Sequence, residues 1–184
     1  MPATHLTSAD LDAGLDSIRE APRDQGTLEM VVRRPSVGER EVIDEGELDI
    51  VVGLIGDSWN TRHNRHRKDG VPDPDTQINI MGVRAIALIA QDKSRWSLAG
   101  DQLFLDLDLS GDNLPPGTQI EVGSAILQVS AEPHTGCGKF VERFGVDAMK
   151  FVNSATGRAL CLRGINARVV RNGVVRVGDR ARKI

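Results

Sequence analysis

Apolar and polar side chains alternate along several stretches of the chain, and this period of two residues is typical of β-strands. The clearest stretch is 103–109, where every second residue is a leucine. Alternation or a short apolar run also predicts strands at 26–34, 41–43, 48–55, 118–122, 125–131, 167–170 and 174–177, and two strands within 77–90. Many short strands separated by glycine turns favour a mainly β fold, either a β-barrel or another compact β structure.

Two dipeptides between predicted strands indicate β-hairpins. Gly123-Ser124 separates the strands on either side of it, and Asn172-Gly173 separates 167–170 from 174–177. Asn-Gly fits the left-handed backbone of a two-residue hairpin turn better than other natural pairs. We therefore expect 167–170 and 174–177 to pair antiparallel.

Three segments are predicted to be short helices. Residues 7–20 can be capped by Thr7 or Ser8 and carry an apolar face that includes Leu11. Residues 138–145 and 146–153 follow each other and are separated at Gly145. The expected organisation is an N-terminal helical extension over residues 1–26 and a β-barrel domain over residues 27–184.

The composition excludes some classes of function. The 184 residues are 40% hydrophobic and 27% charged, as in ordinary soluble domains, and the net charge is −3. This charge and an aromatic content of 3% argue against nucleic-acid binding through either electrostatics or base stacking. The longest apolar stretches, 50–55 and 86–90, are too short to span a membrane, so no membrane partner is expected.

The two cysteines, Cys137 and Cys161, have different surroundings in the sequence. Residues 1–12 lack the basic and apolar regions of a secretory signal, so we expect a cytoplasmic protein with free thiols. Cys137 lies between glycines near basic residues and is expected to line an accessible pocket. Cys161 lies between leucines and is expected to be buried.

The segment 133–140 holds the strongest candidate for chemistry, because Cys137 stands just before a predicted helix. A helix N-terminus and positive side chains favour the thiolate and so lower the pKa of a thiol. Glycines beside it allow a ligand to approach the backbone. The neighbours concerned are His134, Gly136, Gly138 and Lys139. The alternative interpretation is a small residue in a tight turn.

Polar residues beside apolar strands are further candidates for holding a ligand. Asp57 follows the apolar segment 48–55 and could orient a ligand or a basic residue, or cap a turn. Gln77 and Asn79 share one face of a predicted strand, so their amides could bond a heterocycle or the backbone.

A basic run at 62–68 offers a possible anion site. Arg62 and Arg65 could bind a phosphate group through charge-assisted hydrogen bonds, although a solvated loop explains the run equally well. The two histidines of this run would complete a four-ligand zinc set with His134 and Cys137 if the fold brought the two pairs together.

Several motifs occur in an order that resembles one known family. They lie at 53–57, 114–118, 122–129, 133–140, 143–145, 164–169 and 173–179. Together they resemble the MOSC domain, which is named for the C-terminal domain of molybdenum-cofactor sulfurases. The resemblance covers residues 28–180, and the chain looks like a small stand-alone member of bacterial type.

The resemblance implies a MOSC-type β-barrel with a few short helices and a bound molybdenum cofactor, molybdopterin. It places the family's cysteine at Cys137, as a molybdenum ligand or a persulfide carrier, and a soft thiolate suits either role. His134 would tune this thiol and Lys139 would favour its thiolate form. The candidate cofactor-binding residues are Asp57, Arg62, Arg65, Gln77, Asn79, Gly136 and Gly138.

If the protein is an enzyme, the resemblance implies a molybdenum-dependent reductase of N-hydroxylated substrates or a sulfur transferase. A reductase would need an external reductase as partner, because the sequence has no flavin or iron–sulfur motif. A sulfur transferase would need a cysteine desulfurase, because no desulfurase domain is recognised in this sequence. The alternatives are a non-catalytic carrier or insertion module for the cofactor, and a metal-free thiol enzyme. In the latter, Cys137 would be the nucleophile and His134 the base.

Overall fold

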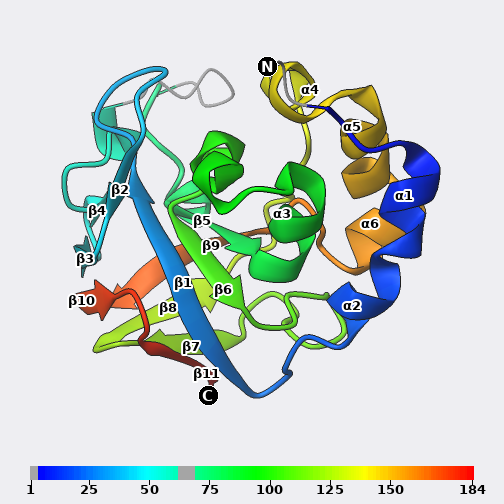
Figure 1. Ribbon diagram of the computed structural model, residues 1–184. Coiled ribbons are helices and arrows are strands. Elements are labelled where there is room, and N and C mark those ends of the chain that lie inside the picture. The colour runs from blue at the N-terminus through cyan, green and yellow to red at the C-terminus, as the bar shows by residue number, and fades with distance from the viewer. Residues whose placement is uncertain (1–3, 62–68) are drawn as a thin grey trace.

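Seven β-strands close into a barrel in the computed structural model, which describes residues 4–61 and 69–184 (Figure 1). They are β1 (Gln25–Arg33), β5 (Ile78–Gly82), β6 (Leu103–Asp106), β7 (Gln119–Val122), β8 (Ala125–Val129), β9 (Ile165–Arg171) and β11 (Arg180–Lys183). Their order is β11-β7-β8-β9-β5-β6-β1, and pairing of β1 with β11 closes the barrel. The mainly β, barrel-type fold predicted from the sequence is confirmed.

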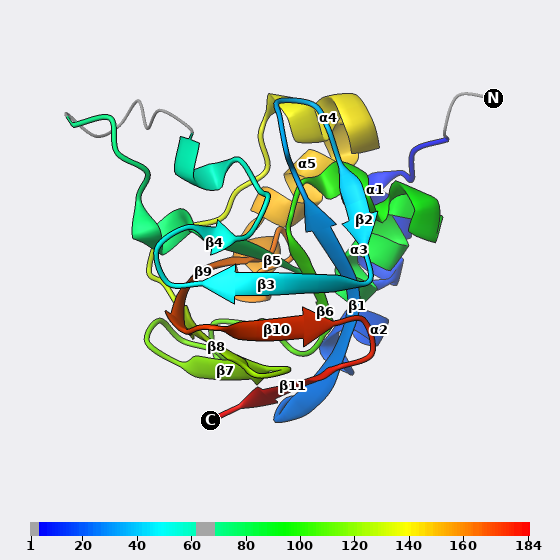
Figure 2. The ribbon, with the colours of Figure 1, turned by 90° about the vertical axis from the view of Figure 1, so that its left-hand side faces the viewer.

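A small second sheet packs on the barrel (Figure 2). Its strands, in order, are β10 (Gly173–Arg176), β3 (Glu45–Asp49) and β4 (Gly53–Leu54), while β2 (Glu41–Ile43) extends the barrel sheet beyond β1. Leu48, Leu54 and Val175 from this sheet are buried among the residues of the barrel interior. The two sheets therefore share one hydrophobic core.

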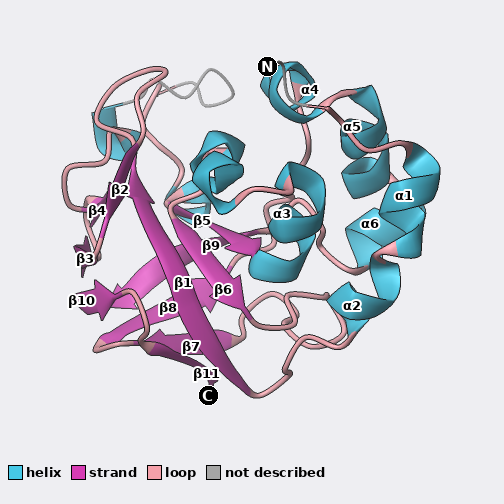
Figure 3. Cartoon of the chain, viewed as in Figure 1, coloured by secondary structure: helices cyan, strands magenta, loops and turns pink. Residues whose placement is uncertain are grey.

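The helices gather on one side of the barrel (Figure 3). They are α1 (Ser8–Ala13), α2 (Leu15–Arg19), α3 (Val83–Ala90), α4 (Gly138–Phe144), α5 (Val146–Asn153) and α6 (Ala155–Ala159), with 3-10 turns η1 (Trp59–Thr61), η2 (Pro74–Thr76) and η3 (Lys93–Ala99). None of the helices in the described part of the chain is long and apolar enough to cross a membrane.

Side-chain alternation gives the barrel two apolar layers. Leu103 and Leu105 belong to the core inside the barrel, whereas Phe104 between them packs with the helices outside it. The outer core also contains Leu11 of α1 and Phe140 of α4. The helical side of the molecule is therefore attached to the barrel by a continuous apolar layer.

The segment 83–90 is helix α3, and the prediction of a second strand there is wrong. β5 and β6 are parallel neighbours, and a connection between parallel strands must cross from one end of the sheet to the other. The helix supplies most of that crossover. Its buried residues, Ala85, Ile86, Ile89 and Ala90, lie on one helical face, which explains an apolar pattern that also resembles a strand.

The segment 48–55, predicted as a single strand, contains the end of β3, a turn and β4. Asp49 Oδ1 accepts hydrogen bonds from the backbone N–H groups of Val51 (2.7 Å) and Val52 (3.0 Å), and these bonds reverse the chain. Ile50 and Val51 are consequently exposed. An apolar run that suggested a buried strand is therefore split by one carboxylate.

The helix predicted at 7–20 is divided into α1 and α2 at Gly14. A Cβ at this position would lie 2.5 Å from a methyl carbon of Leu88 on α3, so any larger residue would require the Leu88 side chain to move. Thr7 caps α1 as predicted, since its side chain accepts from the backbone N–H of Asp10. The helices predicted at 138–145 and 146–153 are confirmed as α4 and α5.

The hairpin predicted at 123–124 is confirmed, but the antiparallel pairing predicted across 172–173 is wrong. β9 already has β8 on one edge and β5 on the other, so it has no free edge for β10. β10 pairs with β3 instead. Asn172 supports this arrangement, because its side chain bonds both the backbone N–H of Ile50 and the carboxylate of Asp49.

Substitution of Leu105 by alanine is expected to lower the free energy of unfolding by about 2–5 kcal/mol, because the side chain is fully buried inside the barrel. Val37→Ala is the control, since Val37 is 83% exposed and should change stability by less than about 0.5 kcal/mol. Denaturant unfolding of both variants measures the difference. Equal stabilities would contradict this assignment of the core.

Candidate functional site

Cys137 occupies the N-cap position of α4, and its side chain is exposed. Its carbonyl oxygen accepts hydrogen bonds from the backbone N–H groups of Phe140 (2.9 Å) and Val141 (3.2 Å). Gly138, the first residue of the helix, has no heavy atom within 4 Å of the position that a Cβ would take. The thiol is therefore open to solvent at the start of the helix.

The loop that leads to Cys137 is held by side-chain amides. Asn153 at the end of α5 bonds Gly136 twice: the Gly136 N–H donates to Oδ1 (2.9 Å), and Nδ2 donates to the Gly136 carbonyl (3.1 Å). Asn166 Nδ2 donates to the carbonyl of Glu132 (3.0 Å) at the other end of the loop. These contacts give the Cys137 backbone a defined position.

The same loop is anchored to a buried carboxylate. His134 Nε2 lies 2.8 Å from Asp101 Oδ1, and Arg163 Nη1 donates to Asp101 Oδ2 at 2.7 Å. The Asp101 side chain has no exposed surface. Arg163 also donates to the carbonyl of Ala99, and its guanidinium lies 5.1 Å from the centre of the Phe140 ring, a cation–π contact with α4.

These contacts and the burial of the side chains determine the protonation states of Asp101 and His134. Burial alone would raise the pKa of Asp101, but the charge of Arg163 and the hydrogen bonds from both partners hold it well below its ordinary value. Burial and the charge of Arg163 lower the pKa of His134, and the attraction of Asp101 does not offset them. At neutral pH, Asp101 is a carboxylate and His134 is neutral. Nε2 therefore carries the ring proton, and Nδ1 keeps a lone pair.

Asp57 orients a basic residue, one of the roles that its position in the sequence allowed. Its two oxygens accept from Arg34 Nε (2.8 Å), Arg34 Nη2 (2.9 Å) and the backbone N–H groups of Arg34 and Trp59 (2.9 Å each). Both side chains are buried. The acceptor positions of this carboxylate are filled by protein groups, so the structure assigns Asp57 to support rather than to ligand contact.

Asn79 and Gln77 take part in the same buried support. Arg34 Nη1 donates to Asn79 Oδ1 at 2.8 Å, and Asn79 Nδ2 donates to Asn166 Oδ1 at 2.6 Å. Within residues 4–61 and 69–184, the partners of the Gln77 amide are backbone groups: Nε2 donates to the Ile50 carbonyl, and Oε1 accepts from the Val169 N–H. Hydrogen bonding to the protein, the alternative to binding a heterocycle, accounts for both amides.

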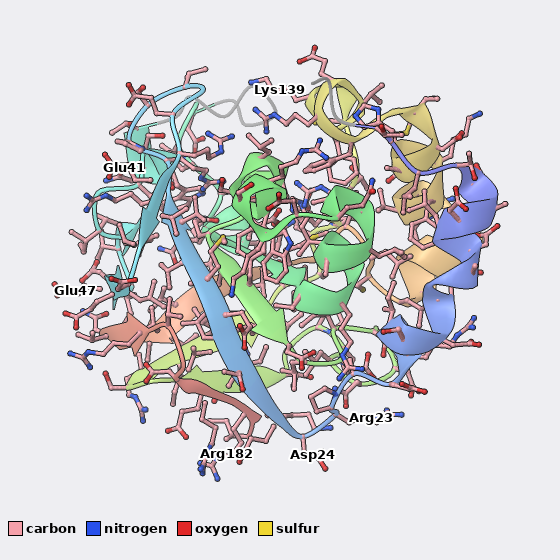
Figure 4. The ribbon with its side chains drawn as sticks, viewed as in Figure 1. Arg23, Asp24, Glu41, Glu47, Lys139 and Arg182 are labelled. Carbon is pink, nitrogen blue, oxygen red and sulfur yellow. The ribbon has the colours of Figure 1, made fainter. Side chains whose placement is uncertain are left out.

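Lys139 is the basic residue that follows Cys137 by two positions on α4. Figure 4 shows Lys139 on α4, far from Arg182 near the C-terminus, and its side chain is exposed. Arg62 and Arg65, with the two histidines of their run, lie outside the described residues. Among the described residues, no three His, Cys, Asp or Glu side chains gather in a way that could hold a metal ion.

Cys161 is half-buried, not fully buried as its leucine neighbours suggest, and it adopts a left-handed backbone with φ of 49°. Burial raises the pKa of its thiol. It lines a cavity of about 260 Å³ together with His134, Arg158 and Arg163. Cys137 is not among the described residues around this cavity. The more enclosed thiol is therefore the one beside the cavity.

The residues that sequence reasoning missed are those that support the loop: Arg34, Asp101, Asn153, Arg163 and Asn166. Each is separated in sequence from the residue it holds, so no local spacing reveals the pairing. The one available signal is that charged residues in largely apolar surroundings need partners when they are buried.

Solved structures of low sequence identity have a similar fold. The YuaD protein from Bacillus subtilis is 18% identical, with a TM-score of 0.63 over 85% of this chain and 94% of that one. YiiM from Escherichia coli is 20% identical, with a TM-score of 0.53 over 86% and 69%. YiiM from Geobacillus stearothermophilus is 14% identical, with a TM-score of 0.52 over 86% and 73%.

No family model matches the sequence, and no curated protein matches it. The similarity to YuaD and YiiM supports a MOSC-like fold, in agreement with the sequence motifs. The chain therefore has a MOSC-like β-barrel fold, and it presents an exposed cysteine at the start of a helix.

The Asp101–His134 pair is expected to make the protein less stable in mild acid. Unfolded histidine has a pKa of about 6.5, and His134 has a lower one when folded. As the pH falls through about 6.5, the unfolded state takes up a proton that the folded state does not, so stability falls by up to about 1.4 kcal/mol per pH unit. The lowered pKa of Asp101 acts only in stronger acid.

Denaturant unfolding between pH 7.5 and about 5.5 tests this expectation. His134→Gln keeps an amide donor near the position of Nε2 for Asp101 but does not titrate, so its stability should depend less on pH. His5→Asn, at an exposed histidine, should keep the wild-type dependence. A His134→Gln profile identical to that of the wild type would refute the assignment.

Replacing Asn153 by alanine is expected to loosen the Cys137 loop, because it removes both bonds to Gly136. Backbone amide exchange at Gly136 and Cys137 should become faster by about 10-fold, as for the loss of one to two hydrogen bonds. Asn172→Ala, in a distant turn, is the control. Unchanged exchange at Gly136 in Asn153→Ala would show that the amide does not hold this loop.

Proposed function

We propose that the protein binds a molybdenum cofactor, or carries sulfur, through Cys137. The observation that carries the proposal is an exposed thiol on a loop that buried side chains hold in place. A side chain that must meet a cofactor or a partner protein needs both access and a fixed position. The MOSC-like fold supports the same choice.

The donor set around Cys137 fits a cofactor that brings most of its own ligands. No described cluster of His, Cys, Asp or Glu could hold a free metal ion. One soft thiolate is sufficient when the dithiolene of a pterin supplies the other sulfur ligands. Bound in this way, molybdenum would supply the redox chemistry.

Residues of this chain would then ligate the metal, hold the loop in position and supply positive charge. Cys137 would be the metal ligand, and the Asn153 and Asp101 contacts would hold its loop. Lys139 is exposed two residues further on and would favour the thiolate and an anionic cofactor group. Arg62, Arg65, Gly136 and Gly138 would contribute to cofactor binding as the resemblance implies.

The sulfur-carrier form of the proposal uses the same thiol. The Cys137 thiolate would attack the terminal sulfur of a persulfide on a cysteine desulfurase. The donor's sulfur–sulfur bond would break, its thiolate would leave, and Cys137 would hold the transferred sulfur as a persulfide. Exposure of the thiol is required for this transfer, because the donor is another protein.

Two related functions follow from the same site. With an external reductase, the bound cofactor could reduce N-hydroxylated substrates; without turnover, the protein would be a carrier or insertion module. The remaining alternative is a metal-free thiol enzyme, in which His134, whose pKa is lowered by burial and by the charge of Arg163, would be the general base.

Metal and pterin analysis of protein purified without oxygen from a molybdenum-replete host tests the proposal. Cys137→Ser should lose cofactor at least 10-fold if the thiolate is a ligand, since outer contacts alone rarely retain a metal centre. Cys161→Ser is the matched control and should keep it.

Mass spectrometry of the same samples separates the alternatives. Stoichiometric molybdenum and pterin support the cofactor function. A mass increase of one sulfur atom on Cys137, without metal, supports the carrier function. Absence of metal, pterin and persulfide from the wild-type protein would contradict the proposal. The metal-free thiol enzyme would then be the remaining alternative.

A further inference from the structure

We propose that the cavity beside His134 binds a small monocarboxylate that also carries a hydroxyl or a similar hydrogen-bond donor. The cavity has a volume of about 260 Å³ and is lined by α6, the start of β9 and the loop after β8. Its described lining does not include Cys137, so this site is independent of the function proposed for that thiol.

His134 supplies an acceptor for the ligand. Its Nε2 is engaged with Asp101 at 2.8 Å, and a carboxylate can only accept, so Nε2 is the donor. The ring is otherwise without a hydrogen bond in the described part of the chain. The side chain is 16% exposed and lines the cavity, and Nδ1 is the ring atom that can still accept a hydrogen bond from a hydroxyl of the ligand.

Two arginines line the cavity, and the charge of one of them, Arg163, is already paired with Asp101. The exposed guanidinium of Arg158 on α6 has no hydrogen bond or ion pair among the described residues, so its charge is available to a carboxylate. The side chain of Arg163 is 9% exposed, and its Nε is buried without a partner. A buried donor left unpaired is unfavourable, and an acceptor of a ligand that reached it from this cavity would offset part of that cost.

The size of the cavity and the negative charge of Glu132 in its wall restrict the ligand. Drug-sized ligands occupy pockets of about 300–1,000 Å³, so a volume of about 260 Å³ indicates a smaller molecule. Glu132 also lines the cavity, and its negative side chain repels a polyanion such as a nucleotide phosphate. Arg158 can pair with one carboxylate, and Glu132 disfavours any further negative charge.

The remaining wall is apolar and fits a short hydrocarbon body. Leu114, Val129 and Ile165 are buried residues of the barrel core that also line the cavity. A branched aliphatic chain between the carboxylate and this wall would bury apolar surface without an unpaired polar group. An aliphatic α-hydroxy acid combines all three features.

NMR titration of the full chain with α-hydroxyisocaproate tests the proposal. Saturable shifts are expected at the backbone amides of Thr135, Arg158 and Gly164, which line the cavity. Isocaproate lacks the hydroxyl and should bind about 3- to 10-fold more weakly, as for one neutral hydrogen bond. The neutral α-hydroxyisocaproamide should bind more weakly by about 10- to 100-fold, as for one charge-assisted bond.

Variants identify the residues responsible. Arg158→Gln should weaken binding of the hydroxy acid by about 10- to 100-fold, whereas Lys150→Gln, at an exposed cation on α5, should not change it. Cys137→Ser should bind as the wild type does, which separates this proposal from the function of the thiol. No saturable shift at the cavity amides, full affinity in Arg158→Gln, or loss of binding in Cys137→Ser would overturn it.

Discussion

A carboxylate buried away from water is unfavourable unless charged partners and hydrogen bonds compensate for the lost hydration, and Asp101 is such a group. Arg163 takes one of its oxygens and His134 takes the other. Because the three residues come from the segment before β6, the segment before β9 and the loop after β8, the pairing joins three distant parts of the chain. His134 belongs to the loop that carries Cys137, and it also lines the cavity. Its bond to Asp101 therefore helps to position both the loop and the cavity wall.

A second buried ion pair reinforces the same loop from the other end. Asp57 fixes Arg34, Arg34 bonds Asn79, Asn79 bonds Asn166, and Asn166 holds the carbonyl of Glu132. Loss of one member of such a chain leaves polar groups buried without partners, which costs more than the bond itself. The barrel thus does more than provide a hydrophobic core: its polar side chains determine where an exposed thiol stands.

The sequence predicted most of the strands and the helices around Cys137, because alternation, Gly-Ser turns and caps are local signals. It failed where tertiary pairing decides. Residues 83–90 look like a strand until the parallel pairing of β5 and β6 requires a crossover, and Asn172-Gly173 looks like a hairpin until both edges of β9 are occupied. The same limit explains why the sequence predicted only part of the site. Cys137 and His134 lie in one local motif and were recognised, whereas Asp101 and Arg163 lie 33 and 29 residues from His134 and were missed.

The closing pair of the barrel, β1 with β11, has a consequence for how the chain is made. Thr27 pairs with Arg180, so the first barrel strand leaves a ribosome long before its partner. Until then the Gln25–Thr27 part of β1 lacks its β11 partner and is open to any other extended chain, and contacts so distant in sequence form slowly. We expect nascent chains that stop short of β11 to be the species most prone to aggregate during synthesis.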